Sequence, residues 1–145
     1  MNIAVDFDGT IVTHKYPLIG EELPFAVETL KMLQKEGHNL VLWSCRQGQL
    51  LDDALNWCRE RGLEFYAANR DYPEETTDNN PDYTRKLKVD LFIDDRGIGG
   101  LPDWGTIYEM IRKHRSWYDL LQEAEGRRSF DSMEQKHKKK WWKRH

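Results

Sequence analysis

The chain begins with a short apolar run that ends abruptly in two aspartates, in the sequence MNIAVDFDGT. Residues 2–7 have the length and the apolar, partly β-branched character of a buried strand. Side chains two residues apart on a strand point the same way, so Asp6 and Asp8 would share a face if the extension continued. Two carboxylates that close repel each other unless a cation or a proton lies between them. Because Gly9 permits a tight turn at the strand tip, where open α/β sheets bind ligands, the pattern favours a ligand site over an acidic turn that closes an ordinary strand.

Three further features follow in a fixed order. A second apolar run ends in Ser44, Lys86 comes next, and a third apolar run ends in the pair Asp94 and Asp95. Together with the opening DFDGT, this order resembles the haloacid dehalogenase-like (HAD) superfamily of phosphohydrolases. The four motifs of that family are DxDx[TV] on the first strand, Ser or Thr after the second strand, a lysine and an acidic pair. Any one of them is weak evidence, but the ordered set is strong.

The resemblance implies a role for each motif residue. Asp6 would be the nucleophile that attacks phosphorus and becomes an aspartyl-phosphate. Asp8 would protonate the leaving group and then deprotonate the water that hydrolyses the intermediate. Ser44 would donate a hydrogen bond to the transferred phosphoryl group, and Lys86 would neutralise the nucleophile and the phosphate. Lys88 is the alternative to Lys86, but it stands almost at the start of the expected strand, where it would face solvent.

The resemblance also implies a Mg²⁺ ion. Its ligands would be the carboxylate of Asp6, the main-chain carbonyl of Asp8 and the carboxylate of Asp94, with Asp95 either a ligand or a partner of one. Mg²⁺ suits a site made of carboxylates, a carbonyl oxygen and waters. Family dehalogenases lack an acid/base at position 8 and the family's ion pumps carry threonine there, so the aspartate implies rapid hydrolysis and hence a phosphatase.

The segments between the motifs alternate between helix and strand. Residues 21–36 predict an amphipathic helix that Gly37 ends, with Phe25, Leu30 and Leu33 facing inward.

Residues 49–61 predict a second helix that Gly62 ends, residues 63–67 a third strand, and residues 106–125 a further helix. Strands that alternate with helices predict parallel βαβ units. The expected fold is therefore α/β, with a single doubly wound, mostly parallel sheet that has helices on both faces. Right-handed crossovers would bring the carboxyl ends of the strands, and the motif residues with them, to one edge.

The intervals between the motifs are too short to hold a cap domain, which HAD enzymes often insert. Residues 11–20 suffice for a short flap, and residues 69–84 are rich in Pro, Asp, Asn and Thr, which predicts a loop. The resemblance is therefore to the small uncapped members, whose site is open unless a second subunit of a homo-oligomer covers it. Candidates for substrate binding are His14 and Lys15 on the flap and Arg46, which either grips phosphate bidentately or pairs with an acidic neighbour.

Length and composition fit one globular domain, since the chain has 145 residues, 39% of them hydrophobic and 12% aromatic. We expect this domain to cover residues 1–126. No stretch approaches the roughly 20 apolar residues of a membrane span, and the N-terminus shows no export signal, so a cytoplasmic protein is expected. Cys45 and Cys58 form no metal or disulfide pattern. Cys45 is expected to be a small buried side chain at a strand end; the alternative is that it approaches the site, since it follows Ser44 directly.

Residues 127–145 form a separate basic tail in this interpretation. Residues 134–145 carry six Lys or Arg and one Glu, whereas the whole chain has a net charge of -3. The charge asymmetry predicts a solvated basic arm, or one that contacts its own acidic body, an anionic substrate or a second subunit. The alternative is contact with single-stranded nucleic acid through the lysines and stacking on Trp141 and Trp142.

The sequence thus predicts a Mg²⁺-dependent, uncapped HAD-like phosphatase that hydrolyses a phosphate monoester, a small molecule rather than a macromolecule. One alternative is a non-catalytic phosphate- or nucleic-acid-binding module, which would not need the acid/base of the Asp6 and Asp8 pair. Another is a phosphoacceptor signalling domain, in which the acidic pair comes first in the chain. The physiological substrate is not evident from the residues.

Overall fold

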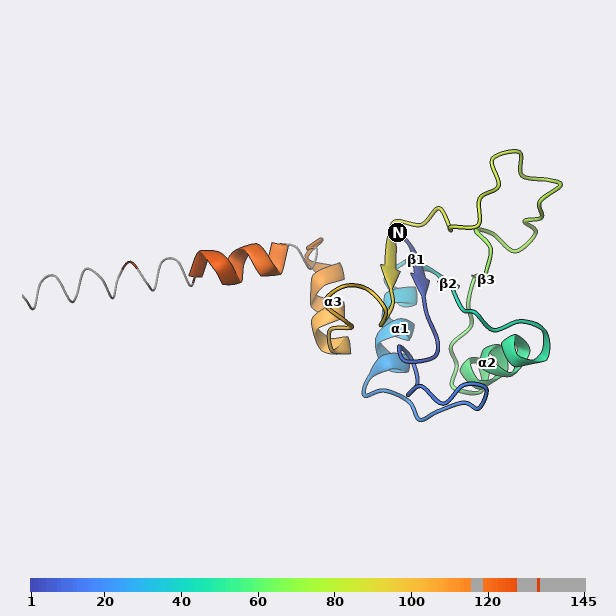
Figure 1. The fold of residues 1–145 in the computed structure, drawn as a ribbon, viewed down its shortest axis with the longest axis horizontal. Coiled ribbons are helices and arrows are strands. Elements are labelled where there is room, and N and C mark those ends of the chain that lie inside the picture. Colours follow the sequence, from blue (N-terminus) through green and yellow to red (C-terminus); the bar gives the residue numbers. More distant parts are fainter. Residues whose placement is uncertain (116–118, 128–132, 134–145) are drawn as a thin grey trace, which may run out of the picture. The chain divides into compact units, whose positions relative to one another are not determined.

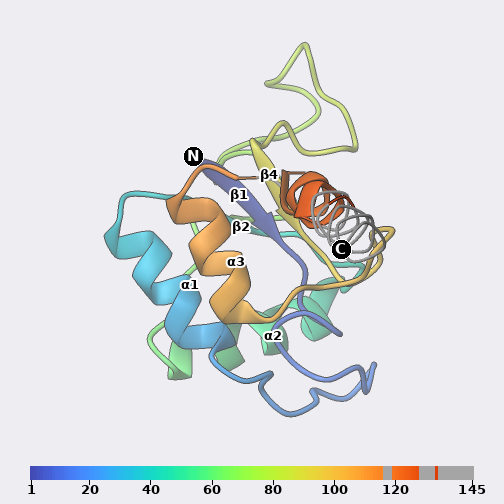
Figure 2. The same ribbon diagram turned by 90° about the vertical axis from the view of Figure 1, so that its left-hand side faces the viewer.

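The computed structural model describes residues 1–115, 119–127 and 133. The chain divides into two compact units, Met1–Thr106 and Ile107–His145, and all the motif residues belong to the first. The described residues form an α/β structure with one all-parallel sheet of four strands and with four helices, one of them at residues 119–127. The other elements, labelled in Figure 1 or Figure 2, are β1 (Asn2–Val5), α1 (Ala26–Lys35), β2 (Asn39–Leu42), α2 (Gly48–Glu60), β3 (Ala67–Ala68), β4 (Leu91–Ile93) and α3 (Trp104–Arg112).

The strand order places β1 inside the sheet, between β2 and β4. The order across the sheet is β3-β2-β1-β4, so the chain moves outward from β1 to β3 and then returns to the other side of β1. Figure 2 shows β1 and β4 side by side, with Val5 opposite Ile93 in the register. Open parallel sheets bind ligands where the strand order reverses, beyond the carboxyl ends of the strands. In this sheet that point lies between the ends of β1 and β4.

The apolar runs form the strands because both faces of a parallel sheet are buried. Ile3, Ala4 and Val5 of β1 are at most 1% exposed. In α1, Leu30 and Leu33 are fully buried, as the helical spacing predicts. Burial of side chains of this size stabilises the fold by about 1.5–3 kcal/mol each.

Two glycines end α1 and α2 in the same way. Gly37 and Gly62 have φ values of 91° and 77°, in the left-handed region. At each end the glycine N–H and the next N–H bond back to carbonyls three and five residues earlier, which is the Schellman arrangement. The predicted ends of both helices are therefore confirmed.

The start of the first helix was predicted wrongly. The expected helix over residues 21–36 begins only at Ala26, and Phe25 is 74% exposed with a φ of 65° instead of facing inward. The preceding residues pair with the flap, because Thr13 N–H donates to the Glu21 carbonyl and Leu23 N–H to the Ile11 carbonyl. Backbone groups used in this pairing are not available for a helix.

Two other predicted elements differ from the structure. The third strand is Ala67–Ala68 rather than residues 63–67. The helix expected over residues 106–125 is interrupted, because α3 ends at Arg112 and His114 adopts a φ of 52°. His114 and the following N–H complete a Schellman arrangement without a glycine, which the sequence pattern does not announce.

The segments between the motifs are largely irregular. Residues 69–90 hold neither helix nor strand, and residues 11–20 form the expected flap. None of the described helices has both the length and the apolar character needed to cross a membrane. Of the predicted basic tail, residues 128–132 and 134–145, including Trp141 and Trp142, lie outside the described residues.

Candidate active site

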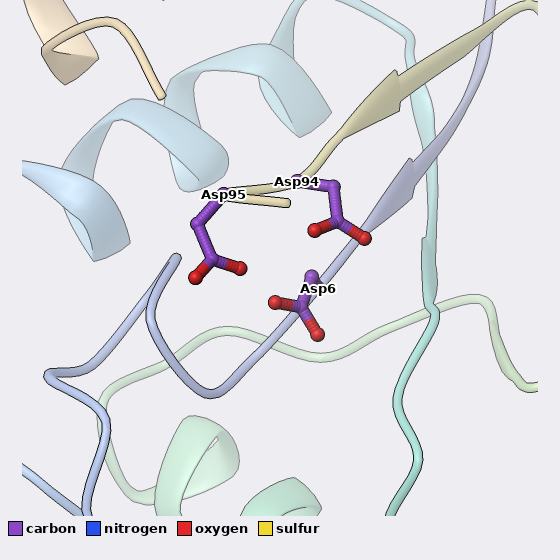
Figure 3. Close-up of side chains that lie close together, drawn as sticks. All are labelled: Asp6, Asp94 and Asp95. Atoms are coloured by element: carbon purple, nitrogen blue, oxygen red, sulfur yellow. The ribbon is translucent and has the colours of Figure 1, made fainter. Parts of the chain in front are cut away.

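Three carboxylates meet where β1 and β4 end. Asp6 directly follows β1, and Asp94 and Asp95 directly follow β4. One oxygen atom from each of the three lies within 4.8 Å of the others, and Figure 3 shows the side chains pointing toward a common point. Asp6 N–H also donates to the Ile93 carbonyl at 3.0 Å, which fixes the two strand ends against each other. We refer to Asp6, Asp94 and Asp95 as the acidic centre.

Gly9 and Thr10 complete the first motif and support the acidic centre. The Thr10 hydroxyl is fully buried, donates to Asp6 Oδ2 at 3.0 Å and accepts the Asp95 N–H at 3.2 Å. Trp104 Nε1 in turn donates to the Thr10 carbonyl at 3.1 Å. A Cβ atom at Gly9 would lie 2.3 Å from Asp95 Oδ2, and Gly9 has a φ of 86°, so only glycine fits at this position.

The electrostatic effect of the acidic centre is concentrated on Asp6. Burial first, and then the hydrogen bond with Asp95 and the charge of Asp94, raise the pKa of Asp6 from 3.8 to about 7. The hydrogen bond from Thr10 opposes this shift in pKa. Carboxylates this close together, partly removed from water, favour the binding of either a proton or a cation between them.

Asp8 lies in a different environment from Asp6. Arg46 Nε donates to Asp8 Oδ2 at 2.7 Å, and Arg46 Nη2 donates to Asp8 Oδ1 at 2.7 Å. This is a bidentate, charge-assisted pair. The hydrogen bond to Asp8 is the main reason that the pKa of Arg46 is raised above its usual value. β1 ends at Val5, and Asp8 lies outside the acidic centre.

Ser44 is held by the segment that follows β2. Its N–H donates to Asn69 Oδ1 at 2.8 Å, and its Oγ accepts the Arg46 N–H at 3.1 Å. Because Oγ is an acceptor in this contact, its hydrogen is available to a ligand. Cys45, which was expected to be buried, is exposed at the site, so that prediction was wrong. The turn after β2 directs residue 46 rather than residue 45 inward.

A pocket of about 470 Å³ opens over these residues. The motif residues Asp6, Asp8, Ser44 and Asp94 line it. Its other lining residues are His14, Tyr16, Trp43, Cys45 and Arg96.

The pocket contains residues that the sequence interpretation did not select. Trp43 lines it from the end of β2 and also packs against the core cluster around Val41. Arg96 lines it from the turn after the acidic pair, and its guanidinium makes no ion pair with any described residue. Proximity to the motifs was the only sequence signal for either residue.

The predicted lysines and flap residues are placed as follows. Lys86 is exposed with its Nζ 5.5 Å from the centre of the Phe92 ring, and it does not line the pocket. Lys88 Nζ donates to the Asp82 carbonyl, away from the acidic centre. His14 lines the pocket, whereas Lys15 does not. The role expected of Lys86 therefore stays a prediction.

Comparisons with known proteins give one informative result. No protein-family model matches the chain, and no curated protein matches it. Among solved structures, the chain is similar to a conserved protein of Bacteroides thetaiotaomicron, with 67% sequence identity and a TM-score of 0.78 over 83% of this chain and 96% of that chain. The chain therefore belongs to the same protein family as this conserved Bacteroides protein.

Proposed function

We propose that the protein is a Mg²⁺-dependent phosphatase of the uncapped, doubly wound HAD-like type that hydrolyses a phosphate monoester in the cytoplasm. The observation that carries this proposal is that Asp6, Asp8, Ser44 and Asp94, which come from three segments far apart in the sequence, line one pocket. The pocket lies beyond the sheet edge at which the strand order reverses. Residues of this kind at this place support phosphoryl transfer more directly than they support binding alone, because a binding site does not need a nucleophile beside an acid/base.

The acidic centre fits the Mg²⁺ ion that this function requires. Its three carboxylates supply the hard oxygen ligands that Mg²⁺ prefers. Burial and the two neighbouring carboxylates raise the pKa of Asp6, and a bound cation would oppose that shift. Asp6, Asp94 and Asp95 would hold the ion, together with the main-chain carbonyl of Asp8. When bound, Mg²⁺ supplies positive charge that balances the phosphate oxygens and keeps Asp6 ionised.

The side chains would act in two steps. In the first, Asp6 attacks phosphorus, the bond from phosphorus to the ester oxygen breaks, and Asp8 gives its proton to that oxygen. In the second, Asp8 takes a proton from a water molecule that attacks the aspartyl-phosphate. Inorganic phosphate leaves, and Asp6 and Asp8 return to their starting states. The free hydrogen of Ser44 would bond to the transferred phosphoryl group in both steps.

The pocket indicates the size of the substrate. Its volume of about 470 Å³ is within the range of small-molecule sites. Tyr16 and Trp43 give it aromatic walls beside the charged groups. We therefore propose a small organic phosphate monoester, with Lys86 or Arg96 as the cation that contacts its phosphate.

The test is phosphate release from a panel of small phosphate monoesters in the presence of Mg²⁺, with Asp6→Asn as the decisive variant. We expect the wild type to release phosphate and Asp6→Asn to lose at least ~10⁴-fold in kcat, because a neutral amide cannot attack phosphorus. Asp52→Asn is the matched control, since Asp52 is an exposed aspartate of α2 outside the pocket. Equal activity of Asp6→Asn and wild type would contradict the proposal.

A further inference from the structure

Arg46 is a buried cation whose hydrogen-bonding capacity is used completely inside the protein. It is only 1% exposed, although arginine rarely has so little exposure. Its Nε and one Nη2 hydrogen reach Asp8, and the other Nη2 hydrogen reaches the Leu18 carbonyl at 3.0 Å. Its Nη1 group donates to the carbonyls of Pro17 at 3.2 Å and Leu50 at 3.4 Å. These contacts account for all five donor hydrogens of a guanidinium.

The surroundings of Arg46 also fix the plane of its guanidinium. The Cζ atom lies 5.3 Å from the ring centre of Phe7 and 5.3 Å from that of Tyr16. An arginine between aromatic rings is held by cation–π attraction as well as by hydrogen bonds. The contacts come from the first motif, the flap and α2, so one side chain connects three segments of the site.

These contacts exclude the direct grip on phosphate that the sequence had suggested for Arg46. A phosphate oxygen would have to displace either Asp8 or a flap carbonyl to reach a donor hydrogen. The pocket is lined by Asp8 and Tyr16 but not by Arg46. Arg46 therefore lies in the protein interior, and Asp8 separates it from the pocket.

Asp8 remains able to handle a proton in this arrangement. A carboxylate has about four lone-pair positions, and the bidentate pair with Arg46 occupies two of them. Asp8 lines the pocket, and its side chain is 11% exposed. The remaining lone pairs can therefore face the pocket while Arg46 fixes the direction of the carboxylate.

We propose that Arg46 is the positioning residue for Asp8: it orients the Asp8 carboxylate toward the ester oxygen and fixes the flap at Pro17 and Leu18 in the same contact. The proposal rests on the proposed phosphatase function and adds to it a residue that no motif assigns. The effect of Arg46 on proton transfer should exceed its effect, through the flap, on phosphate binding.

Proton transfer to the leaving group can be isolated by the choice of ester. A para-nitrophenolate ion leaves readily without a proton, whereas the alkoxide released from benzyl phosphate requires one as its bond to phosphorus breaks. Loss of a general acid therefore slows hydrolysis of benzyl phosphate more than hydrolysis of para-nitrophenyl phosphate. The ratio of the two rates in one sample does not depend on how much of the protein is folded.

The experiment measures kcat/KM on these two esters, with Mg²⁺, for wild type, Arg46→Met, Arg46→Lys and Asp8→Asn, because kcat/KM includes no step after the ester oxygen has left. We expect Arg46→Met to lose about 10²-fold in kcat/KM on benzyl phosphate and no more than about 10-fold on para-nitrophenyl phosphate. Arg46→Lys keeps the charge but not the bidentate geometry, so it should recover part of the loss. In the Asp8→Asn background, Arg46→Met should leave the ratio of rates unchanged.

Arg59→Met is the matched control, because Arg59 is an exposed arginine of α2 that lies outside the pocket. It should leave both rates unchanged. An equal loss of kcat/KM on both esters would overturn the assignment, since it would point to phosphate binding or to folding. If the wild type hydrolysed neither ester, the proposed function would be contradicted and the role of Arg46 with it.

Discussion

Asp6 and Asp8 are two residues apart in the sequence, yet they occupy opposite electrostatic environments. Asp6 belongs to the acidic centre, where burial and the neighbouring carboxylates raise its pKa to about 7. Asp8 is held by a buried arginine through two hydrogen bonds of 2.7 Å. Two residues of the same type that are treated so differently are suited to different tasks. The electrostatic environment of each aspartate is set by a second segment that contacts it: the residues after β4 for Asp6, and the turn after β2 for Asp8.

Turnover should separate the two aspartates most clearly. Asp6→Asn removes the nucleophile and should leave no measurable turnover, as stated above. Asp8→Asn should retain slow turnover, reduced by about 10²–10⁴-fold, because the nucleophile is intact and only proton transfer is lost. Rapid-quench measurement should show phosphorylated protein accumulating in Asp8→Asn. Equal losses in the two variants, with no accumulation, would remove the distinction between them.

Gly9 tests how tightly the acidic centre is built. Gly9→Ala places a Cβ atom 2.3 Å from Asp95 Oδ2 and also strains a residue with a φ of 86°. We expect a loss of about 2–4 kcal/mol in the free energy of unfolding, measured by urea titration. Gly37→Ala is the control, because Gly37 has a φ of 91° but nothing within 4 Å of the added atom. It should lose only about 1 kcal/mol from backbone strain; similar losses would show that the contact with Asp95 has no influence.

Mg²⁺ affinity should depend on the acidic centre and not on the arginine-bound aspartate. We expect Asp94→Asn to weaken Mg²⁺ binding at least ~10-fold, because it removes a charged ligand. Asp8→Asn should bind Mg²⁺ as the wild type does, since it keeps the main-chain carbonyl. Isothermal titration of the two variants with MgCl₂ measures both values. Weaker Mg²⁺ binding in Asp8→Asn but not in Asp94→Asn would show that the ion binds at the Asp8 side chain instead of at the acidic centre.

The pKa of Asp6 predicts a smaller, pH-dependent effect on the stability of the metal-free chain. The pKa of Asp6 is raised from 3.8 to about 7 in the folded chain. Between these pH values the folded chain holds a proton that the unfolded chain releases, so the free energy of unfolding falls as pH rises from about 4 to about 7. Asp6→Asn lacks this penalty. The difference in free energy of unfolding, Asp6→Asn minus wild type, should therefore be larger at about pH 8 than at about pH 5, by about 1–2 kcal/mol after allowance for screening by solvent.

Urea unfolding with a chelator present measures this difference. Asp52→Asn is again the control and should keep a constant difference from the wild type at both pH values. A difference between Asp6→Asn and wild type that did not change with pH would show that Asp6 is not perturbed by its neighbours.

The sequence was sufficient to predict the elements of the fold that depend on local pattern. The apolar runs form strands, and the helices after β1 and β2 end at Gly37 and Gly62 as expected. The misplaced elements depend on contacts distant in sequence. Residues before Ala26 pair with the flap, so the helix begins only after Phe25, and Phe25 does not face inward. His114 takes a left-handed conformation that propensity assigns to glycine.

The candidate site was predictable to the same degree. The parallel topology brings Asp6, Asp94 and Asp95 together, as the positions of the motifs at strand ends required. The pairing of Arg46 with an acidic neighbour was one of its two predicted roles, but that the neighbour is Asp8 was not evident, because it depends on how the chain turns after β2. A sequence pattern specifies which strand carries a residue but not which way a turn residue points.

The central claim is that Asp6 forms a covalent phosphoryl intermediate. The most direct measurement incubates Asp8→Asn with Mg²⁺ and para-nitrophenyl phosphate, quenches with acid, reduces any acyl phosphate with borohydride and maps the peptides by mass. We predict that Asp6 is converted to homoserine, in amounts that depend on the ester. Release of phosphate with Asp6 unmodified, or modification of a different aspartate, would contradict the claim.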